Sequence, residues 1–178
     1  WAGTSITKQA TTGRIKRLLK VGDDNTIRFL SVEPQYEPVD LTNWLPELDW
    51  VIQGGESGHG AQPFEIEWAF DLKQQCADHQ VSYFLKQLGS HVTEGGERIS
   101  FSDDHAGDWS EWPKAIRVRQ LPVQDDQHSG HVSGEATQAT REGAKPGSHG
   151  RTRSDNKRKR SEAARKAWET RRAMQLQK

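Results

Sequence analysis

The sequence predicts an α/β protein, built as a partial (β/α) barrel or an open parallel sheet of about four strand–helix units, followed by a disordered linker and a C-terminal basic helix. Three observations lead to this class. Strand-like runs alternate with segments of helical periodicity over residues 1–122, which is typical of parallel sheets. Large apolar residues then disappear after Pro122. The chain of 178 residues is also shorter than the roughly 250 residues of a complete eight-unit barrel.

The strands and helices are predicted from periodicity and from the residues that stop each element. Ile15, Leu18 and Leu19 form one apolar face of the first predicted helix. Along the second, Ile66, Ala69, Phe70, Lys73, Cys76 and Ala77 are expected to share one side. The connection over residues 35–48 holds two prolines and no convincing long helix. Strands are predicted over residues 1–6, 26–33, 49–54 and 81–86, and helices over 10–21 and 63–79.

The charge of the chain is divided unevenly along its length. The 25 basic and 25 acidic residues cancel overall. Residues 1–122 nevertheless carry 12 basic and 18 acidic residues, whereas residues 151–178 carry 11 basic and 3 acidic ones. Residues 123–160 contain no Leu, Ile, Phe, Tyr or Trp, so they cannot bury enough apolar surface to offset their ordering entropy. We therefore predict an α/β domain over 1–122, a disordered linker over 123–155 and a basic helical tail over 156–178.

Composition also limits the class of protein. No run approaches the roughly 18 apolar residues of a membrane helix, and we expect a cytoplasmic protein with no membrane partner. The single cysteine, Cys76, excludes an internal disulfide and a cysteine-held cluster within this chain, and no metal site is predicted. Because strand-like sequence starts directly at Trp1, we interpret the chain as a fragment of a longer protein.

Polar or glycine-rich residues follow each predicted strand, where parallel α/β proteins carry their sites. Alternation places Ser31 and Glu33 on one face of their strand and Lys86 on the equivalent face of another. Two strand spacings, about 9–10 Å, separate Glu33 from Lys86, a gap that a lysine side chain can bridge. Each residue also has a structural explanation, as a strand terminus, a turn or a solvated charge. The candidate cofactor-binding residues are Ser31, Glu33, Gly54, Gly55, Glu56 and Lys86.

Three segments resemble one known family: Arg28–Pro34 (RFLSVEP), Asp49–Gly58 (DWVIQGGESG) and Tyr83–Gly89 (YFLKQLG). The resemblance is to the phage-associated gp thirty-seven / gp sixty-eight family, a domain of unknown function, and we expect it to end near Pro122. It implies a partial barrel of the radical S-adenosylmethionine type, in which an N-terminal cysteine segment holds a [4Fe–4S] cluster.

The same resemblance implies a function. The chain would be the C-terminal part of such a protein and would contribute its cofactor and substrate cavity. It would be inactive alone, because the cysteine segment is absent from it. A Gly-Gly-Glu segment contacts the methionyl amine of S-adenosylmethionine in such enzymes. Glu56 would then hold an amine, Lys86 a carboxylate or phosphate, and Glu33 would position either group.

The basic tail supports a different class of function, an accessory protein that binds nucleic acid. Ser161 is a suitable helix N-cap, and strong helix formers follow it. Basic side chains on such a helix can follow a phosphate backbone, and Trp168 can stack or dock. The alternative is a solvated tail, or one that pairs with the acidic domain. The predicted nucleic-acid contacts are Lys157, Arg158, Lys159, Arg160, Arg165, Lys166, Arg171 and Arg172.

Overall fold

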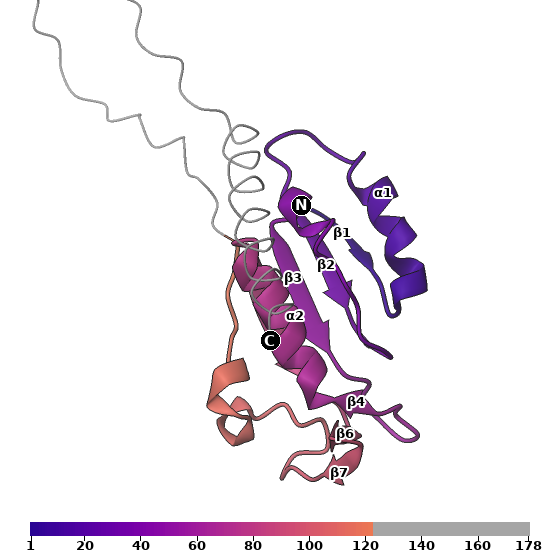
Figure 1. The fold of residues 1–178 in the computed structure, drawn as a ribbon, viewed down its shortest axis with the longest axis vertical. Helices are drawn as coiled ribbons and strands as arrows, with labels where there is room; N and C mark the ends of the chain where they lie inside the picture. The colour runs from indigo at the N-terminus through magenta and orange to yellow at the C-terminus, as the bar shows by residue number, and fades with distance from the viewer. Residues whose placement is uncertain (123–178) are drawn as a thin grey trace, which may run out of the picture.

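The computed structural model describes residues 1–122, and its centre is a four-stranded sheet in which all strands are parallel (Figure 1). The strands are β1 (Ala2–Ser5), β2 (Arg28–Val32), β3 (Trp50–Gly54) and β5 (Ser82–Gln87). They lie in the order β1-β2-β3-β5, which is their order along the chain. The predicted parallel α/β sheet is therefore confirmed. It is an open sheet: the strands of residues 1–122 do not close into a barrel.

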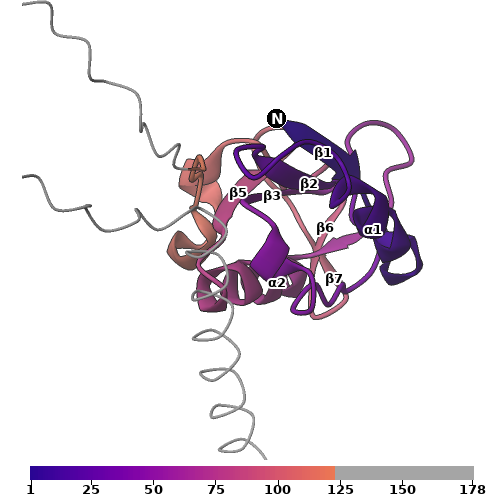
Figure 2. The same cartoon turned by 90° about the horizontal axis from the view of Figure 1, so that it is seen from above.

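Two α-helices cross between these strands, and both lie on the same side of the sheet (Figure 2). Helix α1 (Ile15–Leu18) connects β1 to β2, and α2 (Ile66–Asp78) lies between β3 and β5 in the chain. Parallel crossovers are right-handed in nearly all proteins. Since each crossover here steps to the next strand in the same direction, right-handedness places every helix on one face. Within residues 1–122, the opposite face of the sheet has no helix over it.

The first helical segment differs from its prediction. Residues Gln9–Arg14 form the 3₁₀ helix η1, and only α1 that follows is α-helical. The Thr11 hydroxyl donates to the Lys8 carbonyl at 2.7 Å and accepts from the Lys8 and Thr7 amides. Threonine hydroxyls that bond to nearby backbone compete with α-helical hydrogen bonding. The expected apolar face is present in part, because Ile15 and Leu18 are buried.

The second helix begins later and faces a different direction than predicted. Phe64–Glu65 form the short strand β4, and α2 starts only at Ile66. Phe70 is 37% exposed, and Lys73 and Ala77 also lie outside the core, so their predicted place on the buried side is wrong. The missing member of that side was Leu72. The buried residues of α2 are Ile66, Ala69, Leu72 and Cys76.

A small second sheet at the lower end of the molecule was not predicted (Figure 1). It has the order β4-β6-β7, with β6 at Val92–Glu94 and β7 at Glu97–Ile99. The β6–β7 hairpin turns at Gly95 and Gly96, which both have positive φ. A two-residue hairpin favours such residues. Residues 1–122 contain two helical crossovers, fewer than the four strand–helix units expected. The β2–β3 connection contains only the 3₁₀ helix η2 (Leu45–Glu47), as its prolines predicted.

The outer edge of β5 is covered by the last described residues. After the 3₁₀ helices η3 (Trp109–Glu111) and η4 (Lys114–Ile116), the chain runs antiparallel to β5. The Leu85 amide donates to Val118 at 2.9 Å, and the Gln120 amide donates to Tyr83 at 2.9 Å. The Arg119 guanidinium lies 5.2–5.7 Å from the rings of Phe84, Trp109 and Trp112. Cation–π contact of this kind fixes the segment against the sheet.

The two faces of the sheet differ as side-chain alternation predicts. Leu30, Val32, Val51 and Leu85 point toward the helices and are fully buried. We call the opposite side the helix-free face. It carries Trp1, Gly3, Phe29, Ser31 and Glu33, with Trp50, Ile52, Gly54, Phe84 and Lys86.

Two further predictions concern membrane crossing and the C-terminal segments of the chain. Within residues 1–122, no helix has the length and apolarity that crossing a bilayer requires. The predicted linker over 123–155 and the basic helical tail over 156–178 lie outside the described residues.

Candidate functional site

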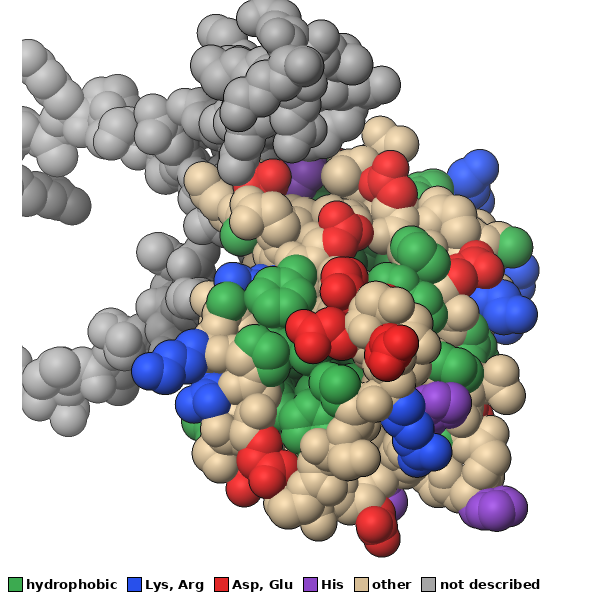
Figure 3. All heavy atoms as spheres, turned by 60° about the horizontal axis from the view of Figure 1, so that its bottom comes forward, with side chains coloured by type: hydrophobic (Ala, Val, Ile, Leu, Met, Phe, Trp, Pro, Cys, Tyr) green, Lys and Arg blue, Asp and Glu red, His purple; other side chains and the backbone are tan. Residues whose placement is uncertain are grey.

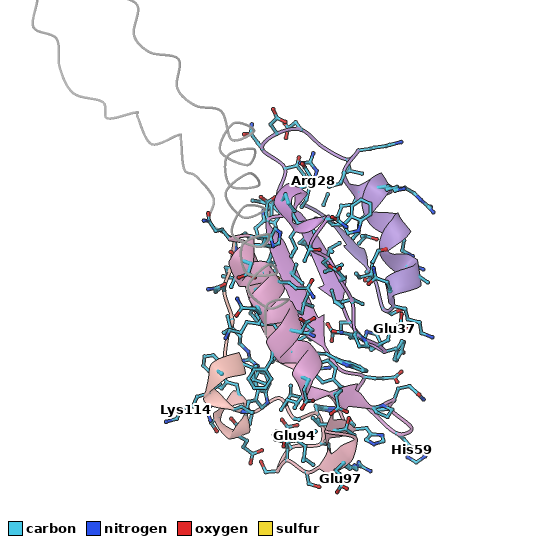
Figure 4. The ribbon with its side chains drawn as sticks, viewed as in Figure 1. Arg28, Glu37, His59, Glu94, Glu97 and Lys114 are labelled. Atoms are coloured by element: carbon cyan, nitrogen blue, oxygen red, sulfur yellow. The ribbon has the colours of Figure 1, made fainter. Side chains whose placement is uncertain are left out.

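The carboxyl ends of the parallel strands form the polar end of the molecule. Figure 4 shows His59, Glu94 and Glu97 at this end, whereas Arg28 lies at the opposite end of the sheet. Figure 3 brings the same end forward and shows carboxylates around apolar side chains, with Lys and Arg further out. Reactive groups of parallel α/β proteins gather at this edge, so it is the candidate site.

An ion pair spans the helix-free face at this edge. Lys86 Nζ lies 2.8 Å from Glu33 Oε1, although β3 separates the strands that carry them. The bridge passes over Gly54, where an added Cβ would lie 3.2 Å from Glu33 Cδ. The predicted approach of Lys86 to Glu33 is therefore confirmed, and Gly54 leaves the space for it. Glu33 is mostly covered, with 18% of its side chain exposed, whereas Lys86 is 53% exposed and open to a ligand.

Gln87 links this ion pair to the loop after β3. Its Nε2 donates to Ser57 Oγ at 2.7 Å, to the Gly55 carbonyl at 3.3 Å and to Glu33 Oε1 at 3.4 Å. The side chain therefore holds the Gly-Gly-Glu-Ser segment beside the carboxylate. Sequence reasoning missed Gln87 because it stopped at Lys86, the last residue of the predicted strand.

The second glycine of the Gly-Gly-Glu segment serves close packing of the backbone. A Cβ at Gly55 would collide with the carbonyl oxygen of Leu88. Gly89 has a φ of +93°, and its own Cβ would meet the backbone of Glu56. The loops after β3 and β5 thus touch main chain to main chain, which requires residues without side chains. Backbone packing within the protein therefore explains why Gly55 and Gly89 are glycines.

Glu56 is held by two donors of its own. The Tyr36 hydroxyl donates to Oε1 at 3.1 Å, and the Gln62 amide donates to Oε2 at 2.8 Å. Burial, together with the hydrogen bond and the negative charge of Glu56, raises the pKa of Tyr36. Tyr36 therefore stays protonated and continues to donate. Tyr36 and Glu56 lie 20 residues apart in the chain, so no local sequence pattern indicated that they pair.

An aromatic row lies on the helix-free face toward the other end of the strands. Trp1 meets Trp50 edge to face at 5.9 Å between ring centroids, and Trp50 meets Phe84 at 5.9 Å in the same way. Phe29 joins the row at 5.8 Å from Trp50, and its ring lies over Gly3. Ser31 lies between this row and Glu33 along β2. The face thus changes from aromatic to ionic along the strands, as the wall of an amphipathic cavity does.

A buried polar network lies on the helix side of the same sheet. Gln53 Nε2 donates to Gln35 Oε1 at 2.5 Å and to the Trp68 carbonyl at 3.0 Å, and the Tyr83 hydroxyl donates to Gln53 Oε1. Gln35 and Gln53 are almost entirely covered. Buried amides of this kind require every partner, so the network fixes the sheet beneath the site. Alternation placed Gln53 beside Val51 but gave no sign of its partners.

A hollow of about 560 Å³ lies beside this edge, lined in part by His59, His91, His105 and Arg98. Asp103 also borders it, but its carboxylate accepts from the amides of His105, Gly107 and Asp108. These bonds, with the nearby His105, lower the pKa of Asp103. Among residues 1–122, no three His, Cys, Asp or Glu side chains are arranged to hold a metal ion.

The structure brings part of the predicted site together. Ser31, Glu33, Gly54 and Lys86 share the helix-free face, and Gly55 and Glu56 follow directly in the loop beyond β3. The predicted nucleic-acid contacts, from Lys157 to Arg172, lie outside the described residues.

The residues of this chain do not fit the iron–sulfur cluster that the resemblance implies. The chain has one cysteine, and Cys76 is fully buried on the inner side of α2. Burial raises the pKa of the Cys76 thiol, which disfavours the thiolate that a cluster needs. A [4Fe–4S] cluster requires several thiolates, so no step through a cluster is assigned to this chain.

Comparison with known proteins gives one match. The model of a family described as "Protein of unknown function (DUF5131)" matches residues 1–172. The match continues beyond Pro122, the residue near which the predicted resemblance ends. No curated protein and no solved structure matches the chain.

Proposed function

The chain belongs to this DUF5131 family, and we propose that its residues 1–122 form one wall of a cofactor and substrate cavity in a phage-associated protein of the radical S-adenosylmethionine type. The observation that carries the proposal is the helix-free face. Parallel sheets are normally covered on both faces, whereas within residues 1–122 no helix lies over the aromatic row and the ion pair of this sheet, which are partly exposed. A wall of that composition suits a ligand with an apolar part and a charged end.

The ion pair gives the wall its chemistry. The methionyl end of S-adenosylmethionine carries an ammonium and a carboxylate. Glu33 and Lys86 offer the opposite charges 2.8 Å apart at the carboxyl edge, and Glu56 follows in the adjoining loop. Ser31 would contact the ligand between the ionic and aromatic ends of the wall. The chain alone would bind and orient such a ligand without catalysis, because it holds no cluster ligands.

The test is a titration of S-adenosylmethionine into the chain, followed by the intrinsic fluorescence of the aromatic row. We expect Lys86→Gln and Glu33→Gln each to weaken binding by about tenfold, since a charge-assisted hydrogen bond contributes about 1.5–3 kcal/mol. Lys114→Gln is the matched control, since Lys114 lies on η4 and takes no part in the ion pair. An absence of binding both to this chain and to a longer family member with a cysteine segment would refute the proposal.

A second candidate function is nucleic-acid binding through the tail. The observation that favours it is the excess of basic residues over 151–178, 11 against 3. Filter binding at two salt concentrations tests it, because phosphate contacts release counterions and make affinity strongly salt-dependent. We expect deletion of residues 151–178 to abolish the salt-sensitive component. Unchanged binding after the deletion would exclude the tail as the binding segment.

A further inference from the structure

The outer side of α2 is an exposed stripe of acidic and aromatic residues. Glu67, Phe70, Asp71 and Gln74 are exposed at positions i, i+3, i+4 and i+7 of the helix, a spacing that places them on one face. We call these four residues the α2 stripe. Phe70 is among the large apolar side chains that the described part of the chain leaves exposed. The stripe combines an apolar anchor with negative charge, which is unusual for a purely solvated helix surface.

No described Lys or Arg pairs with the carboxylates of the stripe. Asp71 accepts from Gln75 Nε2 at 2.7 Å, a neutral donor. Glu67 lies beside Glu65 and Glu94. Although a backbone hydrogen bond favours its charged form, burial and these two neighbours together raise the pKa of Glu67. The one basic residue of α2, Lys73, lies toward Val118 and Leu121, with which it lines a separate hollow. The stripe therefore presents negative charge that a basic partner would neutralise.

The described chain ends beside this helix. Leu121 lines a hollow of about 430 Å³ together with Ala77 and Gln80 at the end of α2. The next 38 residues, 123–160, can reach across roughly 100 Å when extended. Helix α2 has 13 residues and is only about 20 Å long. The residues after 160 can therefore reach any part of the stripe without moving the domain.

The sequence after 160 complements the stripe. Arg165, Trp168 and Arg172 follow one another at steps of three and four residues, so they would share one face of a helix. Trp168 is the first large aromatic residue after Pro122. The tail carries a net positive charge and the described domain a net negative one. A basic–aromatic–basic sequence with steps of three and four residues is thus available to an acidic–aromatic–acidic surface in which Glu67, Phe70 and Asp71 follow at steps of three and one.

We propose that residues 161–174 dock in cis on the α2 stripe, with Trp168 against Phe70 and with Arg165 and Arg172 on Glu67 and Asp71. The proposal goes beyond the cavity function, because it uses the helix-covered side of the domain. It also supplies a regulatory contact for the second candidate function. The arginines that would contact phosphate are held by the domain, so nucleic acid must compete with the stripe for them.

Backbone amide chemical shifts of the full chain give the first test. We expect the triple substitution Arg165→Gln, Trp168→Ala and Arg172→Gln to move the amide signals of residues 67–74, and to leave those of β2 unchanged. Raising the salt from about 0.02 M to about 0.5 M should move the same signals in the same direction, because screening weakens exposed ion pairs. Unmoved α2 signals would overturn the proposal. Shifts that depend on protein concentration would also overturn it, since the tail would then dock on a second copy.

Tryptic cleavage of the tail in the full chain gives the second test. Glu67→Gln with Asp71→Asn should raise the cleavage rate at Arg165 and Arg172 by about fivefold at low salt, as expected for two exposed ion pairs. Glu97→Gln with Asp104→Asn removes the same charge from the β7 region and should leave the rate unchanged. An equal rise in both variants would show a general charge effect and overturn the docking site.

Discussion

The two faces of the parallel sheet come from the same strands but carry opposite kinds of side chain. Leu30 and Val32 of β2 are fully buried under the helices. Their neighbours Phe29, Ser31 and Glu33 lie on the helix-free face and are only partly covered. Alternation along a strand creates this difference. The helix-covered face holds the fold together, whereas the helix-free face keeps polar and aromatic groups available.

The comparison of the two faces separates residues that stabilise the fold from residues available to bind a ligand. Burial of apolar surface contributes most where exposure is lost completely, and of the two faces of this sheet the helix-covered one carries such side chains, for example Leu30 and Val32. Residues on the helix-free face can therefore be substituted with little loss of folding stability. The predictions below test that separation, beginning with the largest expected effect.

Matched substitutions on β2 should show the difference between the faces directly. Leu30→Ala removes a fully buried side chain and should lower the free energy of unfolding by about 4 kcal/mol. Phe29→Ala, one residue earlier on the helix-free face, should lower it by about 1 kcal/mol despite the larger side chain. Urea denaturation measures both values. Equal losses would mean that the helix-free face is as important for folding as the other.

The two adjacent glycines should respond differently. Gly55→Ala forces a Cβ against the Leu88 carbonyl and should cost about 3 kcal/mol of stability, because backbone cannot yield easily. At Gly54 the three atoms nearest to an added Cβ all belong to the flexible Glu33 side chain, and we expect Gly54→Ala to cost about 1 kcal/mol and to weaken ligand binding. Gly13→Ala is the control, since nothing lies within 4 Å of that Cβ. Thermal unfolding of the three variants measures the order of their stability losses.

The buried amide network should contribute less than the apolar core. Gln53→Leu removes the donor to Gln35 Oε1 and leaves the Tyr83 hydroxyl with the Ala69 carbonyl at 3.4 Å, and a poorly satisfied buried group costs about 2 kcal/mol. Adding Tyr83→Phe should recover part of that loss, because the poorly satisfied hydroxyl is then gone. Additive losses in this double-mutant cycle would contradict the network.

The Glu33–Lys86 pair should contribute least to stability. Because Lys86 is 53% exposed, solvent screening limits the pair, and Lys86→Gln should change the unfolding free energy by no more than about 0.5 kcal/mol. The same variant is expected to lose most of its ligand affinity. A loss of stability well above 1 kcal/mol in urea denaturation would place Lys86 among the structural residues.

The sequence allowed the sheet and part of the site to be predicted because alternation is a local property. Knowing that Phe29 and Leu30 face opposite sides was enough to bring Glu33 and Lys86 together. The 3₁₀ helix at Gln9–Arg14 was missed because the Thr11 hydroxyl bonds to the backbone of Thr7 and Lys8, which periodicity does not report. The strands of the second sheet have two or three residues each, too few for a pattern. The partners of Gln53 and Glu56 come from distant segments, and only the folded chain shows them.

The segment that runs along β5 makes the two edges of the sheet unlike each other. Val118 and Gln120 take the hydrogen bonds that a further strand beside β5 would need, and Arg119 is anchored among three aromatic rings. At the other side, β1 has β2 as its one neighbouring strand within residues 1–122. Any strand that enlarges this sheet must therefore be added next to β1. Residues 1–122 therefore form a sheet with one paired edge and one free edge, and two copies that met at the free edge would form a closed pair with no second free edge for an open-ended stack.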